Sequence, residues 1–133
     1  MTESHLLPRK QTLLLILLPM LGTFLCQRLY LHTIGVHHVY PFGYLVHHLF
    51  FGVFITVPAA FLLAFGTHSR RAAILTRVAL GIGSAMILDE IVYLVMTKAS
   101  DDDYISKTSL YGGMIFMTLG VILLAAIYWS KRE

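Results

Sequence analysis

The chain has 133 residues, of which 57% are hydrophobic and 13% are charged, and its formal net charge is +3. A soluble domain carries about 25% charged residues, so this composition and a mean hydropathy of +0.75 exclude an ordinary soluble globular domain. No basic face with interleaved aromatic residues occurs, and a nucleic-acid partner is therefore not expected. The single cysteine, Cys26, excludes an intrachain disulfide and a thiolate metal site.

The first apolar run covers residues about 11–31 and follows the basic pair Arg9-Lys10. It is longer than the apolar region of a signal peptide and lacks a small-residue cleavage site, which predicts a retained membrane-spanning helix. Arg28 lies about one turn before the end of this run. We expect its long side chain to reach the membrane surface by snorkelling. The alternatives are that it neutralises an acidic partner, Asp89 or Glu90, or binds an anionic head group.

Three further apolar runs follow, at about 41–65, 72–97 and 109–129. Each exceeds the roughly 20 residues that a helix needs to span the hydrocarbon layer. Pro41 suits the first turn of a helix, and Pro58 is tolerated inside a membrane helix whose neighbours satisfy the freed backbone groups. The polar connections are short, which favours antiparallel neighbours. The sequence therefore predicts one all-α membrane domain over 1–133, with four transmembrane helices in an up-down-up-down bundle.

The basic residues of the short loops predict the orientation of this bundle. One side of the membrane receives seven basic residues, whereas the other receives two lysines beside the Asp101-Asp102-Asp103 run. The protein is therefore predicted to lie in the plasma (inner) membrane with both termini on the cytoplasmic side. The connections at 32–40 and 98–108 are predicted to face the outer side. The cytoplasmic group is Arg9, Lys10, Arg70, Arg71, Arg77, Lys131 and Arg132, and the outer pair is Lys98 and Lys107.

Two adjacent acidic residues, Asp89 and Glu90, lie inside the third apolar run. An ionisable side chain at such depth costs roughly 2.5–3.5 kcal/mol on insertion scales, so two of them need partners. The second run offers His47 and His48. At 1.5 Å per residue, the histidines lie roughly 9–11 Å and the acids roughly 10–12 Å below the same outer surface. We therefore predict that the two pairs meet inside the outer half of the bundle.

Imidazole and carboxylate groups together form the ligand set of zinc or iron, and imidazole also suits copper. The sequence thus predicts that His47, His48, Asp89 and Glu90 hold a divalent transition metal, namely zinc, iron or copper. Neither Glu-x-x-His nor His-Glu-x-x-His spacing occurs, so the residues do not identify the metal. A metal-bound water would supply a nucleophile near neutral pH.

Glu90, Asp89, Tyr93 and Tyr44 form the predicted catalytic set. The acids would transfer protons, whereas the tyrosines, each one turn from an ionisable pair, would donate hydrogen bonds. This interpretation favours a small integral membrane metalloprotein, an enzyme acting on a lipophilic substrate, with membrane lipid as its partner. The loop histidines His37 and His38 would either extend this site or lie solvated at the membrane surface.

Two other functions fit the same residues. Carboxylate and histidine chains in membranes carry protons or ions, and four helices with an apolar inner half would need a homo-oligomer to conduct them. Alternatively, the chain is a structural assembly subunit whose buried polar network only fixes the helix register. The sequence does not decide between an enzyme and these alternatives.

Overall fold

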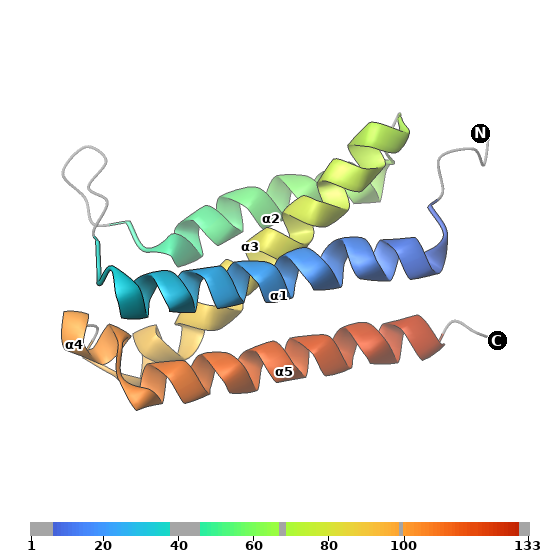
Figure 1. Cartoon of the computed structure of the whole chain (residues 1–133). Helices are drawn as coiled ribbons and strands as arrows, with labels where there is room; N and C mark the ends of the chain where they lie inside the picture. The colour runs from blue at the N-terminus through green and yellow to red at the C-terminus, as the bar shows by residue number, and fades with distance from the viewer. Residues whose placement is uncertain (1–6, 38–45, 67–68, 99, 131–133) are drawn as a thin grey trace.

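The computed structural model describes residues 7–37, 46–66, 69–98 and 100–130. These residues form helices and contain no strand. Four of the helices are long and apolar enough to cross a membrane. This confirms the predicted all-α class and the prediction of four long apolar helices. The helices are α1 (Arg9–Thr33), α2 (His48–Phe65), α3 (Arg70–Met96), the short α4 (Asp101–Tyr104) and α5 (Lys107–Ser130) (Figure 1).

Helix α2 begins later than the sequence predicted. Its N-cap residue is His47, whose backbone is extended, and His48 is its first helical residue. The predicted start at Pro41 lies outside the described residues, as does Tyr44. The two histidines therefore occupy the end of a helix and do not lie two turns inside it. Other helix ends follow familiar chemistry, since the Ser69 hydroxyl accepts a hydrogen bond from the N–H of Ala72 at the start of α3.

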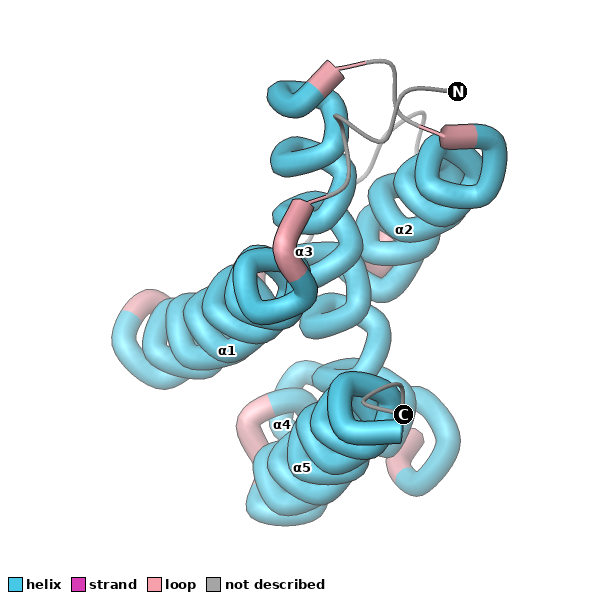
Figure 2. The backbone as a smooth tube through the Cα atoms, turned by 90° about the vertical axis from the view of Figure 1, so that its right-hand side faces the viewer, coloured by secondary structure: helices cyan, strands magenta, loops and turns pink. Residues whose placement is uncertain are grey.

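Helix α3 contacts α1, α2 and α5 and so occupies the middle of the molecule. Figure 2 shows α3 crossing between the other three long helices. Glycines allow the close approaches, because a Cβ atom on Gly52 would lie 2.7 Å from the carbonyl oxygen of Gly83 across the α2–α3 contact. Between α1, α3 and α5, the buried core consists of Met20, Ala85 and Met117.

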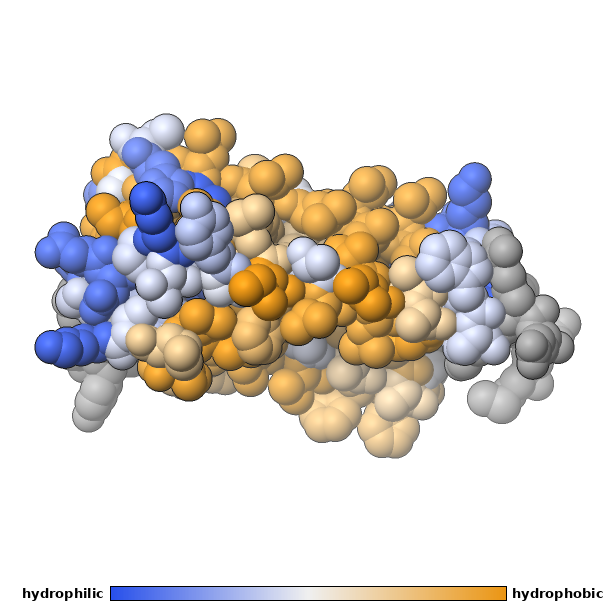
Figure 3. Space-filling view, turned by 90° about the horizontal axis from the view of Figure 1, so that it is seen from below, coloured by the Kyte–Doolittle hydropathy of each residue, from blue (hydrophilic) through white to orange (hydrophobic). Residues whose placement is uncertain are grey.

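The helix ends that carry the predicted site residues His47, His48, Asp89 and Glu90 gather at one end of the molecule. There the end of α1, the start of α2, the end of α3, helix α4 and the start of α5 lie near one another (left in Figure 1). The middle of the molecule is covered by exposed apolar side chains, such as Phe54, Phe61 and Ile115. In Figure 3, apolar side chains occupy the middle of the visible face and polar ones gather toward its ends. A bilayer would cover such an apolar belt.

Gly81 provides a test of the central place of α3. A Cβ atom at this position would overlap the carbonyl oxygen of Ile16 in α1, a backbone atom that cannot rotate away. We expect Gly81→Ala to lower the free energy of unfolding in detergent by about 1–3 kcal/mol, the usual effect of overpacking.

Gly22→Ala is the matched control, because a Cβ atom on Gly22 meets nothing within 4 Å. We expect this variant to unfold at the same or a higher denaturant concentration, since alanine favours helix more than glycine. Equal stability of the Gly81 and Gly22 variants would contradict the described α1–α3 contact.

A polar cluster at one end of the helices

A buried ion pair joins α1, α3 and α5. The guanidinium of Arg28 contacts the Asp89 carboxylate, with Nη2 at 2.5 Å and Nε at 2.6 Å from Oδ1. The same guanidinium donates to the hydroxyl of Ser109 at 3.2 Å and to the Ser109 carbonyl oxygen at 3.0 Å. All three residues are buried, and Asp89 is only 1% exposed. Charge-assisted hydrogen bonds of this kind compensate the desolvation of both ions.

The predicted snorkelling of Arg28 is therefore wrong, and the alternative of an acidic partner is confirmed. Only 6% of Arg28 is exposed, and its charge lies against Asp89 instead of at the surface. Gly113 in α5 leaves room for this pair, because a Cβ atom there would lie 2.7 Å from Asp89 Oδ1 and 2.8 Å from Arg28 Nη2. The absence of a side chain at Gly113 thus makes room for the ion pair as well as for the contact between the helices.

The Glu90 carboxylate accepts a hydrogen bond from a backbone N–H group in the first turn of α2. One of its oxygens, Oε1, is hydrogen-bonded to Nδ1 of His47 at 2.7 Å. The other, Oε2, accepts from the backbone N–H of Leu49 at 2.6 Å. The first N–H groups of a helix lack partners within the helix and carry a partial positive charge, which a carboxylate complements. Glu90 from α3 therefore acts as a cap on a neighbouring helix.

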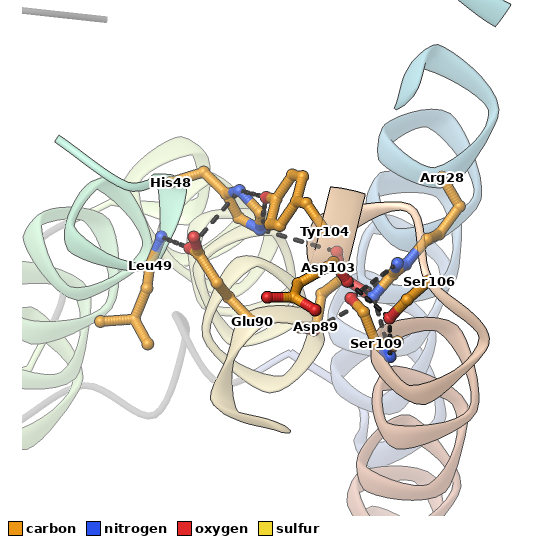
Figure 4. A network of polar contacts seen from close by, with 9 residues as sticks. All are labelled: Arg28, His48, Leu49, Asp89, Glu90, Asp103, Tyr104, Ser106 and Ser109. Carbon is orange, nitrogen blue, oxygen red and sulfur yellow. Dashed lines mark hydrogen bonds and ion pairs between the residues drawn. The ribbon is translucent and has the colours of Figure 1, made fainter. Parts of the chain in front are cut away.

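His48 lies between Tyr104 and the two acids (Figure 4). The Tyr104 hydroxyl is hydrogen-bonded to Nδ1 of His48. The same hydroxyl lies 3.3 Å from Nε2 of His48. Nε2 also lies 3.6 Å from Asp89 Oδ2, while Nδ1 lies 3.4 Å from Glu90 Oε2. Among the described residues, the buried Oδ2 of Asp89 has no hydrogen-bond partner. The His48 imidazole is therefore surrounded by one hydroxyl and two carboxylates.

The structure thus brings His47, His48, Asp89 and Glu90 together, as the sequence predicted. With Arg28, Tyr104 and Ser109 they form what we call the polar cluster. Tyr93 borders it without donating to either acid, because its hydroxyl donates to the Ser100 carbonyl oxygen at 3.4 Å. Its ring contacts that of Tyr104 edge-on, with the centroids 4.4 Å apart. Tyr44 lies outside the described residues.

The metal prediction receives no support from this arrangement. Across the part of the chain that the structure describes, no three His, Cys, Asp or Glu side chains converge as they would around a metal ion. One physical reason is that three of the four carboxylate oxygens are already engaged. Asp89 Oδ1 is bound by Arg28, and both oxygens of Glu90 accept hydrogen bonds. The predicted zinc, iron or copper ion thus remains a prediction without an observed site.

Helix α4 places Tyr104 over His48. The helix is fixed by a capping box, in which the Ser100 hydroxyl accepts from the N–H of Asp103 and donates to its carboxylate at 2.8 Å. The hydrogen bond from the Ser100 side chain, followed by that from the Ser100 backbone N–H, lowers the pKa of Asp103 below its ordinary value of 3.8. Tyr104 itself is 7% exposed and packs against Leu31 and Tyr93.

Sequence reasoning missed two members of the cluster, Tyr104 and Ser109. Tyr104 follows the Asp101-Asp102-Asp103 run, so it resembled an ordinary aromatic residue at the membrane surface. The available signal was the spacing Ser100-x-x-Asp103, which is typical of a capping box and predicts a helical turn there. No sequence signal indicates that Ser109 would accept hydrogen bonds from Arg28.

Comparisons of this chain with protein-family models, with curated proteins and with solved structures find no match. What the polar cluster does must therefore be inferred from its own geometry.

The Arg28–Asp89 pair predicts a distinctive response to mutation. Replacing Arg28 by Met leaves a buried carboxylate without its counter-ion, which typically lowers the free energy of unfolding by about 3–5 kcal/mol. Denaturant titration in detergent micelles, followed by circular dichroism, measures the change.

The double variant Arg28→Met with Asp89→Leu is the control, because it removes both charges at once. We expect it to be more stable than Arg28→Met alone, since no unpaired ion remains buried. If Arg28→Met unfolds like the wild type, the buried pair is not present in the folded protein.

The capping box makes a prediction about pH. Because the folded-state pKa of Asp103 is depressed, its carboxylate stabilises α4 above pH 3.8, and this stabilisation is lost as the pH falls through the lower folded-state value. Ser100→Ala removes the side-chain hydrogen bond and should raise the Asp103 pKa toward 3.8. Carboxyl carbon NMR titration of the two proteins measures this pKa, and an unchanged value in the variant would contradict the capping box.

Proposed function

We propose that this chain is an integral membrane protein whose four long helices cross the bilayer in alternating directions. Both termini lie on the cytoplasmic side of the plasma (inner) membrane, and the polar cluster lies in the outer half. The length and apolar character of the helices support the crossing. The orientation is supported by Arg9, Arg70 and Arg77, which lie near the end of the molecule opposite the cluster, because basic residues favour the cytoplasmic side.

The polar cluster serves, in this proposal, as the acid–base site of an enzyme that acts on a lipophilic substrate. One observation carries it, namely that the His48 imidazole contacts the Tyr104 hydroxyl and lies 3.6 Å from the Asp89 carboxylate. A hydroxyl activated by an imidazole, which a carboxylate in turn orients, is the recurrent arrangement for nucleophilic and proton-transfer catalysis. His48 would accept the proton of Tyr104 or of a substrate, and Asp89 would stabilise the resulting imidazolium.

The distances fit an unliganded acid–base site. The 3.6 Å between His48 Nε2 and Asp89 Oδ2 exceeds a normal hydrogen bond, and such contacts often shorten only when substrate is bound. The other oxygen of Asp89, Oδ1, is held by Arg28, so the carboxylate has one fixed oxygen and one that faces His48. Glu90 fixes the start of α2 and thereby the position of His48.

The surroundings argue against the transport alternative within one subunit. Farther along the helices, a buried apolar cluster of Met20, Ala85 and Met117 lies between α1, α3 and α5. These side chains offer no site that could pass on a proton or an ion. The assembly alternative has a specific observation behind it, since Arg28 joins three helices through Asp89 and Ser109. We assign this register-setting role to the ion pair and the chemical role to His48 and Tyr104.

The proposal is tested in membranes from cells that express wild-type protein, His48→Gln or Tyr104→Phe. Lipid extracts are compared by mass spectrometry with extracts from cells that lack the protein. We expect wild type to consume or produce at least one lipophilic compound, and both variants to slow this change by about 10²–10⁴-fold, the usual contribution of a general acid or base.

His37→Gln is the matched control, because His37 is an exposed histidine near the same end of the molecule. It should leave the change in lipid composition intact. An acid–base role is contradicted if folded His48→Gln protein acts like wild type, or if His37→Gln loses activity equally.

A further inference from the structure

A second feature of the molecule lies away from the polar cluster, along the seam between α1 and α5. A hollow of about 350 Å³ lies where these helices and α3 diverge, and its lining includes Met20, Leu88 and Gly120. A second hollow of about 220 Å³ continues toward the start of α1 and the end of α5. Both hollows are lined by Ile16, Leu124 and Ile127, so they form one continuous groove, here called the seam groove.

One end of the seam groove is basic. Arg9 lines it, lies 5.5 Å from the ring centroid of Tyr128 and donates to the Tyr128 carbonyl oxygen at 2.6 Å. Thr12 also lines this end, and its hydroxyl accepts a hydrogen bond from Nε of Arg77 at 3.2 Å. Arg9 thus lines the basic end of a groove whose other end is apolar, and Arg77, which does not line the groove, lies behind Thr12.

This combination of charge and shape selects the class of ligand. An apolar cavity of roughly 150 Å³ already stays free of water and takes up a small hydrocarbon, so water is not the expected occupant of the seam groove. A groove within the membrane-spanning part of a protein is open to acyl chains. Basic pockets between transmembrane helices on the cytoplasmic side bind anionic head groups. The apolar and the basic part together therefore match one amphipathic molecule.

We propose that the seam groove binds an anionic phospholipid, with one acyl chain between α1 and α5 and its phosphate beside Arg9. The acyl chain would extend toward Met20 and Leu88, and the head group would lie at the end of the molecule opposite the polar cluster. The site shares no residue with that cluster, so it does not depend on the proposed enzyme activity.

To test this proposal, protein purified in mild detergent is reconstituted with phosphatidylglycerol or phosphatidylcholine. Native mass spectrometry then measures which lipid each protein retains. We expect the wild type to retain one phosphatidylglycerol molecule and to prefer it over phosphatidylcholine by about fivefold. Both lipids carry a phosphate, but the choline cation offsets its charge in phosphatidylcholine, and one basic residue favours a net anionic lipid by about 1 kcal/mol. Arg9→Gln should remove the preference. Ile127→Trp, at the junction of the two hollows, should abolish retention of either lipid, because Ile127 is half exposed and a larger side chain there fills the groove.

Two control variants separate these effects from general damage. Arg70→Gln removes a charge at the same end without altering the lining, and Ile122→Trp enlarges an exposed residue of α5 that does not line the groove. Both should retain lipid like wild type. The proposal is overturned if wild type retains no lipid, if it retains both lipids equally, or if Ile122→Trp loses lipid as Ile127→Trp does. It is also overturned if Ile127→Trp dissociates a dimer without changing lipid retention, because a second copy would then occupy the groove.

Discussion

Two adjacent carboxylates inside one apolar helix impose the constraint on which this structure depends. Neighbouring residues on a helix point about 100° apart, so Asp89 and Glu90 direct their shortest contacts toward different helices, although His48 lies near both. In the fold, α3 lies in the middle, with α1 and α5 on the side of Asp89 and the start of α2 on the side of Glu90. The need to compensate two buried charges thus determines which helices surround α3 at this end.

The compensation differs for the two acids, and that difference suggests the division of roles. Glu90 has both oxygens engaged, one by an imidazole and one by the backbone of α2. Asp89 has one oxygen held by Arg28, whereas Oδ2 faces His48 and has no hydrogen-bond partner among the described residues. A buried polar atom without a partner carries a free-energy penalty, and in native proteins such atoms often mark functional sites. We therefore assign the chemical role to His48, which contacts Tyr104 and faces this oxygen.

The helices and the meeting of the two ionisable pairs could be predicted from the sequence, because apolar length and axial depth are readable along a chain. Direction around a helix axis was not readable, so Arg28 was expected at the surface although its guanidinium lies against Asp89. The start of α2 was also missed, since Pro41 favours a helix start but does not require one. Tyr104 reaches His48 only through the turn of α4, a tertiary contact that no periodicity encodes.

Solid-state NMR of the protein in lipid bilayers, with labelled arginine, histidine, aspartate and glutamate, tests the compensated charges most directly. Magnetisation transfer should connect the guanidinium nitrogens of Arg28 with the Asp89 carboxyl carbon, since the nitrogen and oxygen atoms lie 2.5 Å apart. It should also connect the His47 imidazole with the Glu90 carboxyl carbon, across a hydrogen bond of 2.7 Å. Absence of both transfers in folded protein would show that the acids lie elsewhere and would contradict the account.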